Sequence, residues 1–383
     1  MKEILTEKFK TIFNREDGVS YFSPGRVNLI GEYTDFNGGY VMPCGLAFGT
    51  YGIIGLRQDM EVHLYSEGFS KKPYAFELET FFKDDEAPWS DYIKGVIAGF
   101  YQHSVVFPFG FDLYIQGDMP FGAGLSSSAS LEMLVAYALN DLYDLKFERT
   151  ALALIGQYAE NKYVGLHSGI MDQFAVIQAK KNEAILLNTD TLTFELIPFE
   201  LGKYQLMIVN TNKSRGLTDS KYNQRYEECM SALDIVKPLY QIKHLCGLTS
   251  RELPSVEKLL DPIVFKRVRH VVTEQERTIL SSKALKENNI EIFAQMMNGS
   301  HESLKNDFEV TGQALDILVE ASMKAGAIGA RMTGAGFGGC IVAIVEKEKI
   351  KTYIEETGKI YEKQMGIMPT FYTVKAEEGT HKL

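Results

Sequence analysis

Apolar and polar residues alternate over short stretches in the first half of the chain, whereas helical periodicity dominates the second half. In residues 111–116, for example, Phe111, Leu113 and Ile115 alternate with polar residues, a pattern typical of a half-buried strand. These patterns predict strands at 48–57, 60–65, 111–116, 205–210, 340–345 and 370–374, and helices at 89–101, 131–142, 149–163, 219–236, 264–287, 290–307 and 313–325. We therefore expect an α+β protein whose two lobes, residues 1–200 and 201–383, meet near residue 200.

Composition and charge narrow the class of protein. The chain has 383 residues, 45% of them hydrophobic and 23% charged, as in globular proteins large enough for two domains. Its net charge of −10 argues against a nucleic-acid partner, and we expect the basic residues at 266–270 to form a solvated helix face. The first 15 residues lack the apolar segment of a signal peptide, and no run approaches the ~18 apolar residues of a membrane span. Four cysteines far apart in the chain lack metal-ligand spacing, so we expect a cytoplasmic protein with reduced thiols.

A loop rich in glycine and serine, residues 120–130, separates the strand at 111–116 from the helix at 131–142. Glycines allow the backbone to bend closely around a ligand, and the serines place unpaired N–H groups and hydroxyls at the start of the helix. This arrangement is suited to binding phosphate. The same residues also suit an ordinary glycine turn with a serine cap, so both interpretations stay open at this point.

Other phosphate-binding signatures do not fit. The chain has no G-x-x-x-x-G-K-[ST] motif, which excludes a P-loop, and it lacks the H-R-D and D-F-G motifs of protein kinases. Residues 334–339 match G-x-G-x-x-G, but they lead into a predicted strand, whereas a dinucleotide fingerprint opens a helix. These glycines either form a tight corner or let the backbone approach a ligand from the second lobe.

Further segments identify a family resemblance. Residues 31–39 read Gly-Glu-Tyr-Thr-Asp-Phe-Asn-Gly-Gly within a longer motif at 23–39, and residues 169–173 read Gly-Ile-Met-Asp-Gln. Together with the serine-rich loop and the glycines at 332–340, they resemble galactokinases of the GHMP small-molecule kinase superfamily. The similarity extends over the whole chain and includes residues 261–264, 266–270 and 338–343.

The resemblance implies a fold and a reaction. The fold would combine an N-terminal lobe related to ribosomal-protein S5 domain 2 with a ferredoxin-like C-terminal lobe. ATP and the sugar would meet in the cleft between them. The reaction would transfer the γ-phosphoryl group of MgATP to the anomeric 1-hydroxyl of α-D-galactose, giving galactose 1-phosphate for the Leloir pathway. Galactose and ATP would be the partners and Mg²⁺ the cofactor, with no nucleic acid, membrane or obligate protein partner.

The resemblance also assigns the catalytic and metal-binding residues. Asp172 would accept the proton of the 1-hydroxyl or orient that hydroxyl, and a loose transition state leaves both roles open. Arg26 would stabilise the transferring phosphoryl group, and a structural ion pair across the site is compatible with that role. The Ser128 hydroxyl and the Glu160 carboxylate would hold Mg²⁺, which prefers oxygen ligands.

The substrate contacts follow from the same comparison. Glu32, Tyr33, Asp35, Gly169, Asp172 and Tyr222 would bind the sugar, with Asp35 at the 3- and 4-hydroxyls and Glu32 at the 6-hydroxyl. Trp89, Gly122, Ala123, Gly124, Leu125, Ser126, Ser127, Ser128, Ala129, Gly334 and Gly336 would bind ATP. Adenine would stack on Trp89 or lie near Tyr92. Trp89 is equally suited to packing in the core.

One position departs from the family pattern. Galactokinases usually carry histidine after the glutamate of the first motif, near the 6-position of the sugar, and this chain has Tyr33. Tyrosine keeps a donor and an acceptor but is longer and neutral. A sugar-1-kinase with altered preference at C6 is therefore an alternative. A galactose and ATP sensor without turnover is another, although the serine-rich loop, Arg26, Glu160 and Asp172 are all present.

Overall fold

The computed structural model describes residues 1–120, 124–166, 168–213 and 218–383. Gly122 and Ala123, which the sequence assigns to ATP binding, lie outside this part of the chain. Its strands are β1 (Val19–Asn28), β2 (Tyr40–Val41), β3 (Pro43–Leu56), β4 (Glu61–Ser66), β5 (Tyr74–Glu77), β6 (Phe111–Gly117), β7 (Glu183–Asn188), β8 (Phe194–Pro198), β9 (Tyr204–Asn210), β10 (Gly329–Met332), β11 (Cys340–Glu346), β12 (Thr370–Val374) and β13 (His381–Lys382). Its α-helices are α1 (Lys2–Phe13), α2 (Ser90–Gln102), α3 (Ser127–Leu142), α4 (Arg149–Tyr158), α5 (Met171–Gln178), α6 (Thr218–Tyr240), α7 (Leu253–Val256), α8 (Pro262–Lys286), α9 (Ile290–Ser303), α10 (Gly312–Lys324) and α11 (Ile350–Met365).

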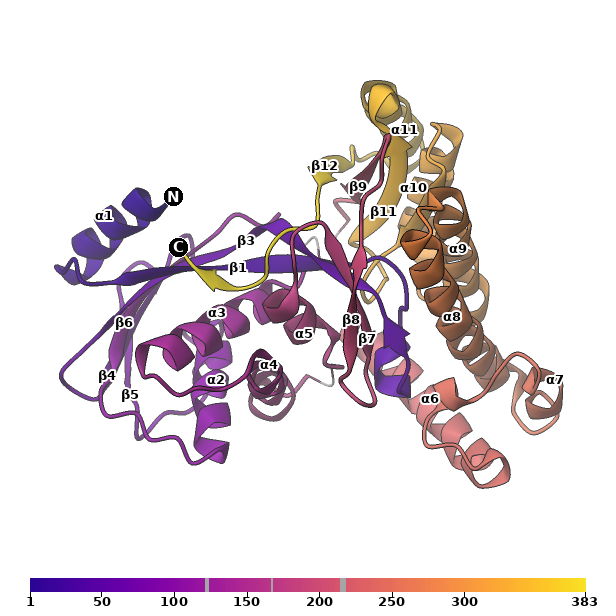
Figure 1. The fold of residues 1–383 in the computed structure, drawn as a ribbon. Helices are drawn as coiled ribbons and strands as arrows, with labels where there is room; N and C mark the ends of the chain where they lie inside the picture. The colour runs from indigo at the N-terminus through magenta and orange to yellow at the C-terminus, as the bar shows by residue number, and fades with distance from the viewer. Residues whose placement is uncertain (121–123, 167, 214–217) are drawn as a thin grey trace.

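A six-stranded sheet in the order β13-β1-β3-β6-β4-β5 forms the first body of the fold. Helices α2 to α5 lie on one side of this sheet and α1 lies on the other (Figure 1). Strand β3 shows how both faces are buried: Ile54 belongs to the core that contains α3, and its neighbour Ile53 packs with Phe9 of α1. Successive strand residues point to opposite faces, so each face of β3 has its own layer of helices.

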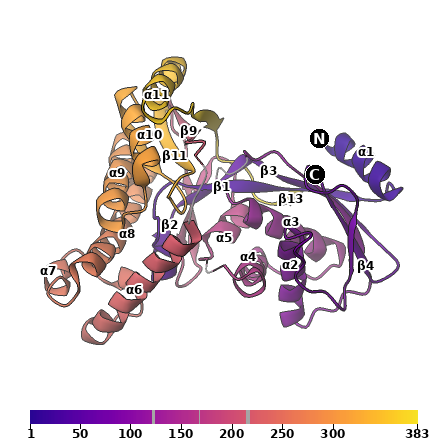
Figure 2. The ribbon, with the colours of Figure 1, turned by 180° about the vertical axis from the view of Figure 1, so that it is seen from behind.

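A four-stranded antiparallel sheet in the order β10-β11-β9-β12 forms the second body, with α8 to α11 grouped around it (Figures 1 and 2). Along β11, Ile341 and Ala343 pack into a core with residues of α8, α10 and α11. The alternate residue Val342 packs into a core shared with Phe293 of α9 and Val27 of β1. This shared core fixes the end of β1 against the C-terminal sheet, and a small sheet, β2-β7-β8, lies beside the junction.

Each predicted helix and strand is present, with shifted ends. Helix α3 begins at Ser127 instead of residue 131, and the helix predicted at 149–163 is α4 continued by a π-helical segment, η2 (Ala159–Val164). Among the elements that the sequence pattern missed is β1, which is buried along nearly its whole length and contains Pro24 and Gly25. Burial on both faces removes the alternation by which a strand is recognised, and proline and glycine indicate a loop.

One expectation about the C-terminal half was wrong in part. Lys266 and Arg269 are 40% and 43% exposed, but the side chain of Arg267 is 2% exposed and His270 is fully buried, so the basic residues at 266–270 do not all lie on a solvated helix face. Arg267 donates to Glu228 and Glu309 at 2.7 and 2.9 Å, so burial of its charge is offset by two carboxylates. The sequence shows the charges but not these distant acceptors.

The ends of the chain lie close together on the first sheet. Strand β13 pairs with β1, and the Lys2 Nζ donates to the backbone oxygen of Leu383 at 2.8 Å. The last residues therefore lie with the N-terminal body, and the division of the chain at residue 200 stays a prediction. Within the described ranges, none of the helices has the length and apolar character needed to cross a membrane.

Candidate active site

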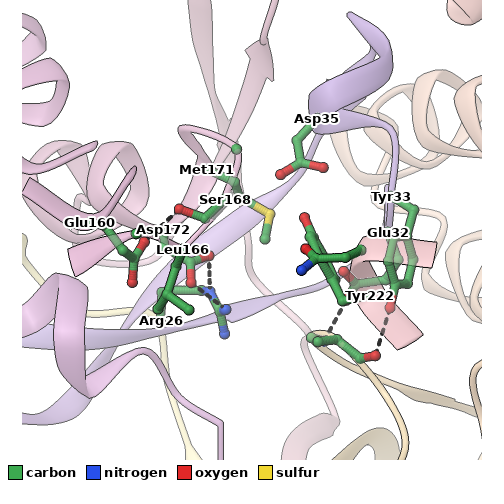
Figure 3. Close-up of a pocket in the computed structure, with 15 residues that line it drawn as sticks. Arg26, Glu32, Tyr33, Asp35, Glu160, Leu166, Ser168, Met171, Asp172 and Tyr222 are labelled. Atoms are coloured by element: carbon green, nitrogen blue, oxygen red, sulfur yellow. Dashed lines mark hydrogen bonds and ion pairs between the residues drawn. The ribbon is translucent and has the colours of Figure 1, made fainter. Parts of the chain in front are cut away.

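A polar cavity of about 200 Å³ lies between the two bodies, where the loop after β1, the start of α5, the start of α6 and the β10–β11 loop meet. In Figure 3, Glu160, Asp172 and Arg26 lie on one side of it and Tyr33 and Tyr222 on the other. The cavity brings together every residue that the sequence assigns to the sugar, namely Glu32, Tyr33, Asp35, Gly169, Asp172 and Tyr222, together with Arg26 and Glu160.

Arg26 and Asp172 form a two-pronged ion pair at the edge of this cavity. The Nε and Nη2 of Arg26 donate to the two carboxylate oxygens of Asp172, each at 2.7 Å. The side chain of Arg26 is 6% exposed and that of Asp172 is 26% exposed, so the buried guanidinium holds a carboxylate that still faces the cavity. The register of β1 shifts between Pro24 and Arg26, and such a bulge redirects the side chains of its strand.

The same pair contacts the serine-rich loop. The Nη1 of Arg26 donates to the carbonyl oxygen of Gly124 at 3.0 Å, and the Ser126 hydroxyl donates to Asp172. A Cβ at Gly25 would lie 2.7 Å from the carbonyl oxygen of Leu125, so glycine is needed where the loop crosses β1. The loop that the sequence predicts to bind phosphate therefore lies against the predicted catalytic residues.

Glu160 lies in the π-helical segment η2 and is 6% exposed. The Ser128 hydroxyl donates to its Oε1 at 3.0 Å, so the two residues assigned to Mg²⁺ are in contact. The Ser168 hydroxyl and the Gln173 amide donate to its Oε2 at 2.6 and 2.9 Å. π-Helical turns are often found at functional sites, and here the turn that follows α4 carries a carboxylate to the cavity.

Sequence reasoning missed a second carboxylate behind Glu160. Glu132 on α3 is fully buried, and its Oε2 accepts from the same Gln173 Nε2 at 2.8 Å. Burial, with the nearby negative charge of Glu160, raises the pKa of Glu132 well above its usual range. Gln173 thus joins two carboxyl groups from different helices. The sequence offered one indication of this role for Gln173, namely that it directly follows Asp172.

Asp35 projects into the cavity from the short 3₁₀ helix η1 (Asp35–Asn37). A Cβ at Gly169 would overlap the Asp35 carboxylate, so only glycine at this position leaves room for it. Burial raises the pKa of Asp35 to about 7, and the negative charges of Asp172 and Glu32 add to this effect. Gly169 therefore acts by admitting the carboxylate of another residue.

Glu32 and Tyr33 connect the loop after β1 to the β10–β11 loop. The Gly334 amide donates to Glu32 Oε1 at 2.8 Å, and the Tyr33 hydroxyl donates to the carbonyl oxygen of Ala335 at 2.6 Å. Tyr33 has a positive φ of 66° and packs against Tyr222 with ring centroids 5.5 Å apart. The tyrosine that replaces the expected histidine thus spans the two bodies at one wall of the cavity.

A larger cavity of about 620 Å³ lies on the other side of the serine-rich loop. Gly124, Leu125, Ser127 and Ser128 line it together with Trp89 and Tyr92. The serines begin α3, whose unpaired N–H groups favour an anion. Five of the nine described residues assigned to ATP thus line this second cavity, and contact with ATP itself stays a prediction.

Four described residues assigned to ATP do not line this cavity, and one of them, Ser126, donates to Asp172 instead. Gly334 lines the polar cavity beside Glu32, and a Cβ at Gly336 would overlap the carbonyl oxygen of Val310. Ala129 is fully buried in the core beneath the loop. The geometry favours structural roles for Gly336 and Ala129 and a role for Gly334 in closing the polar cavity.

Known proteins resemble this chain over its whole length. Family models match at residues 7–56 (Galactokinase galactose-binding signature), 91–180 (GHMP kinases N terminal domain) and 281–360 (GHMP kinases C terminal). A galactokinase from Enterococcus faecalis is 43% identical over 100% of both chains. One from Lactococcus lactis subsp. lactis is 45% identical over 99% of this chain and 96% of its own. The chain belongs to the galactokinase family.

The structures agree with this assignment. The crystal structure of Lactococcus lactis galactokinase complexed with galactose matches with a TM-score of 0.97 at 44% identity, covering 100% of both chains. A mevalonate kinase structure, with a TM-score of 0.65 at 20% identity over 94% of this chain and 99% of its own, shares the fold. The two-lobed GHMP kinase fold predicted from the sequence is confirmed, and this galactokinase-family chain is a kinase.

Proposed function

We propose that the protein transfers the γ-phosphoryl group of ATP to the 1-hydroxyl of α-D-galactose. The observation that carries this proposal is the position of the Arg26–Asp172 pair. Both side chains line the polar cavity, and Arg26 also donates to Gly124, which lines the larger cavity. A sugar in the first cavity and a nucleotide in the second would meet at this pair. The galactose-bound relative and the galactose-binding signature at residues 7–56 support galactose as the sugar.

The reaction needs positioning and charge neutralisation more than covalent chemistry. Asp172, fixed by Arg26 and Ser126, would accept a hydrogen bond from the 1-hydroxyl and orient its oxygen toward the phosphorus. Arg26 stays positively charged during the reaction and would stabilise the negative charge on the oxygens of the phosphoryl group while this group is transferred.

The donor set at Ser128 and Glu160 fits magnesium. One hydroxyl and one carboxylate offer the oxygen ligands that Mg²⁺ prefers, and the ion takes its remaining ligands from water and substrate phosphates. Among the described residues, no group of three or more His, Cys, Asp or Glu side chains could hold a metal ion without such help. When bound, Mg²⁺ would neutralise phosphate charge. Hydrogen bonds from Ser168 and Gln173 to the Glu160 carboxylate would orient this carboxylate for the ion.

An ADP-release assay with a panel of hexoses tests the proposal. We expect turnover with ATP and galactose and much less with glucose, because Asp35 would contact the 3- and 4-hydroxyls and the two sugars differ in configuration at C4. Galactose that binds without ADP release would indicate a sensor. Faster turnover with a sugar altered at C6 would indicate a related sugar-1-kinase. This is the second candidate function because Tyr33 stands where galactokinases usually carry histidine.

Substitution of Tyr33 tests recognition at C6. We expect Tyr33→His to change the ratio of kcat/KM for galactose over 6-deoxygalactose by a few-fold to about tenfold, the value of one neutral hydrogen bond. Tyr33→Phe is the matched control, since it keeps the ring against Tyr222 and loses the hydroxyl bond to Ala335. An unchanged ratio in both variants would place Tyr33 away from C6. A collapse of kcat on both sugars would assign Tyr33 to the catalytic centre.

The raised pKa of Asp35 predicts a pH dependence. Sugar hydroxyls donate best to an ionised carboxylate, and Asp35 loses this form as the pH falls through its pKa of about 7. We expect kcat/KM for galactose to fall about tenfold per pH unit below that value, since this ratio reports the free enzyme. The profile of kcat/KM for ATP should be flatter. A galactose profile that keeps its slope in Asp35→Asn would assign the titration to another group.

A further inference from the structure

Helix α8 holds the backbone of the loop that carries Glu32. The Oε1 of Glu274, a fully buried residue of α8, accepts from the backbone amides of Gly31 and Glu32 at 3.0 and 3.3 Å. The same oxygen accepts from the Ser300 hydroxyl at 2.7 Å, and the Oε2 accepts from Arg277 at 3.0 Å. A carboxylate of the C-terminal half thus binds two consecutive amides of the N-terminal half.

His270 lies one turn earlier on the same face of α8 and is also fully buried. Its Nε2 lies 3.1 Å from the carbonyl oxygen of Glu32, and because a carbonyl only accepts, Nε2 carries the proton. The amide and the carbonyl of Glu32 are therefore both bound by α8. The His270 ring also packs on Phe308, with centroids 4.6 Å apart.

The loop needs partners from outside itself. Gly31 has a positive φ of 93°, and a Cβ there would lie 2.6 Å from the carbonyl oxygen of Tyr40, so the chain turns tightly at this point.

Glu274 is ionised despite its burial. Burial alone would raise the pKa of Glu274, but the positive charge of Arg277 outweighs this effect and keeps the pKa at about 2. The loop amides therefore meet an ionised acceptor, which binds N–H groups more strongly than a neutral one.

We propose that His270 and Glu274 are positioning residues that set the place of Glu32 in the sugar cavity. They touch only the backbone of Glu32, whose carboxylate lines the cavity and accepts from Gly334. This role rests on the proposed function, since it assigns the loop to sugar binding. A buried charge is weak evidence for stability, because apolar residues of similar volume often stabilise a core as well or better. The two side chains instead fix the direction of one loop.

Galactose affinity measured by calorimetry on the purified full chain tests this role. Glu274→Gln keeps the shape but cannot offer an ionised oxygen to the loop, and we expect galactose Kd to rise about tenfold. The affinity for a non-hydrolysable ATP analogue should stay within about twofold, because none of the described residues that line the larger cavity belongs to this loop. Glu276→Gln is the matched control: it lies on the same helix and accepts from Ser250 instead.

His270→Phe gives an independent variant that keeps the packing on Phe308 and removes the donor to Glu32. It should raise galactose Kd several-fold without a matching change for the ATP analogue. Equal loss of both ligands, or failure of both variants to fold, would make the residues structural and overturn the proposal. Unchanged galactose affinity in both variants would also overturn it. If the wild-type protein did not bind galactose, the proposed function itself would fail, and that result appears before any variant is made.

Discussion

Asp172→Asn should lose nearly all turnover while the protein still folds and binds galactose. Positioned acid–base groups contribute on the order of 10²–10⁴-fold, and kcat should fall within that range. Asparagine keeps the size of the side chain but offers only one oxygen to the Arg26 fork and cannot take up a proton. The measurement is kcat from coupled ADP release, together with galactose Kd from calorimetry.

Asp234→Asn, the same change on an exposed stretch of α6, is the control for this variant and should leave kcat unchanged. The assigned role would be wrong if Asp172→Asn kept more than about a tenth of the wild-type kcat. A large loss of galactose binding at normal kcat would instead make Asp172 a binding residue only.

Glu160→Gln should weaken the response to magnesium with little effect on the sugar. Glutamine can still accept from Ser128, but it lacks the charge that attracts the ion. We expect the Mg²⁺ concentration for half-maximal rate to rise at least about tenfold, since even the loss of outer partners costs metal sites 10–100-fold. Binding of Mn²⁺ in the presence of an ATP analogue, followed by electron paramagnetic resonance, gives a readout that does not need turnover.

Glu132→Gln is the matched control for this prediction. Burial raises the pKa of Glu132 and so favours its neutral form, and glutamine is a neutral group of the same shape that can still accept from Gln173. Its magnesium curve should therefore match that of the wild type. A raised galactose KM with an unchanged magnesium curve in Glu160→Gln would move Glu160 from the phosphate to the sugar.

The sequence was most informative where a site is built from residues close in the chain. Motifs at 23–39 and 169–173 named side chains that the structure gathers around the polar cavity, and the serine-rich loop named residues that line the larger cavity. The structure adds the contacts of two of these residues: Gly169 leaves room for the Asp35 carboxylate, and Glu160 accepts from the Ser128 hydroxyl.

The rest depends on contacts between distant segments. His270 belonged to a basic stretch that we assigned to solvent, and its partner Glu32 is 238 residues away in the chain. Nothing in the sequence distinguishes Glu132 from the other residues of its helix. Its role becomes visible only in the structure, where Gln173 of α5 donates to it. Neither hydrophobic periodicity nor charge pattern records which helix meets which loop, so these supporting residues became visible only in three dimensions.

The identity of the phosphorylated product shows which hydroxyl of the sugar accepts the phosphoryl group. Incubation of the protein with MgATP and galactose, followed by ³¹P NMR with proton coupling, distinguishes phosphate on the anomeric carbon from phosphate on C6 by the number of coupled protons. We predict a single product, galactose 1-phosphate, whose phosphorus couples to the one anomeric proton. A phosphorus coupled to the two protons of C6, or ADP formed without any sugar phosphate, would contradict the placement of the 1-hydroxyl at Asp172.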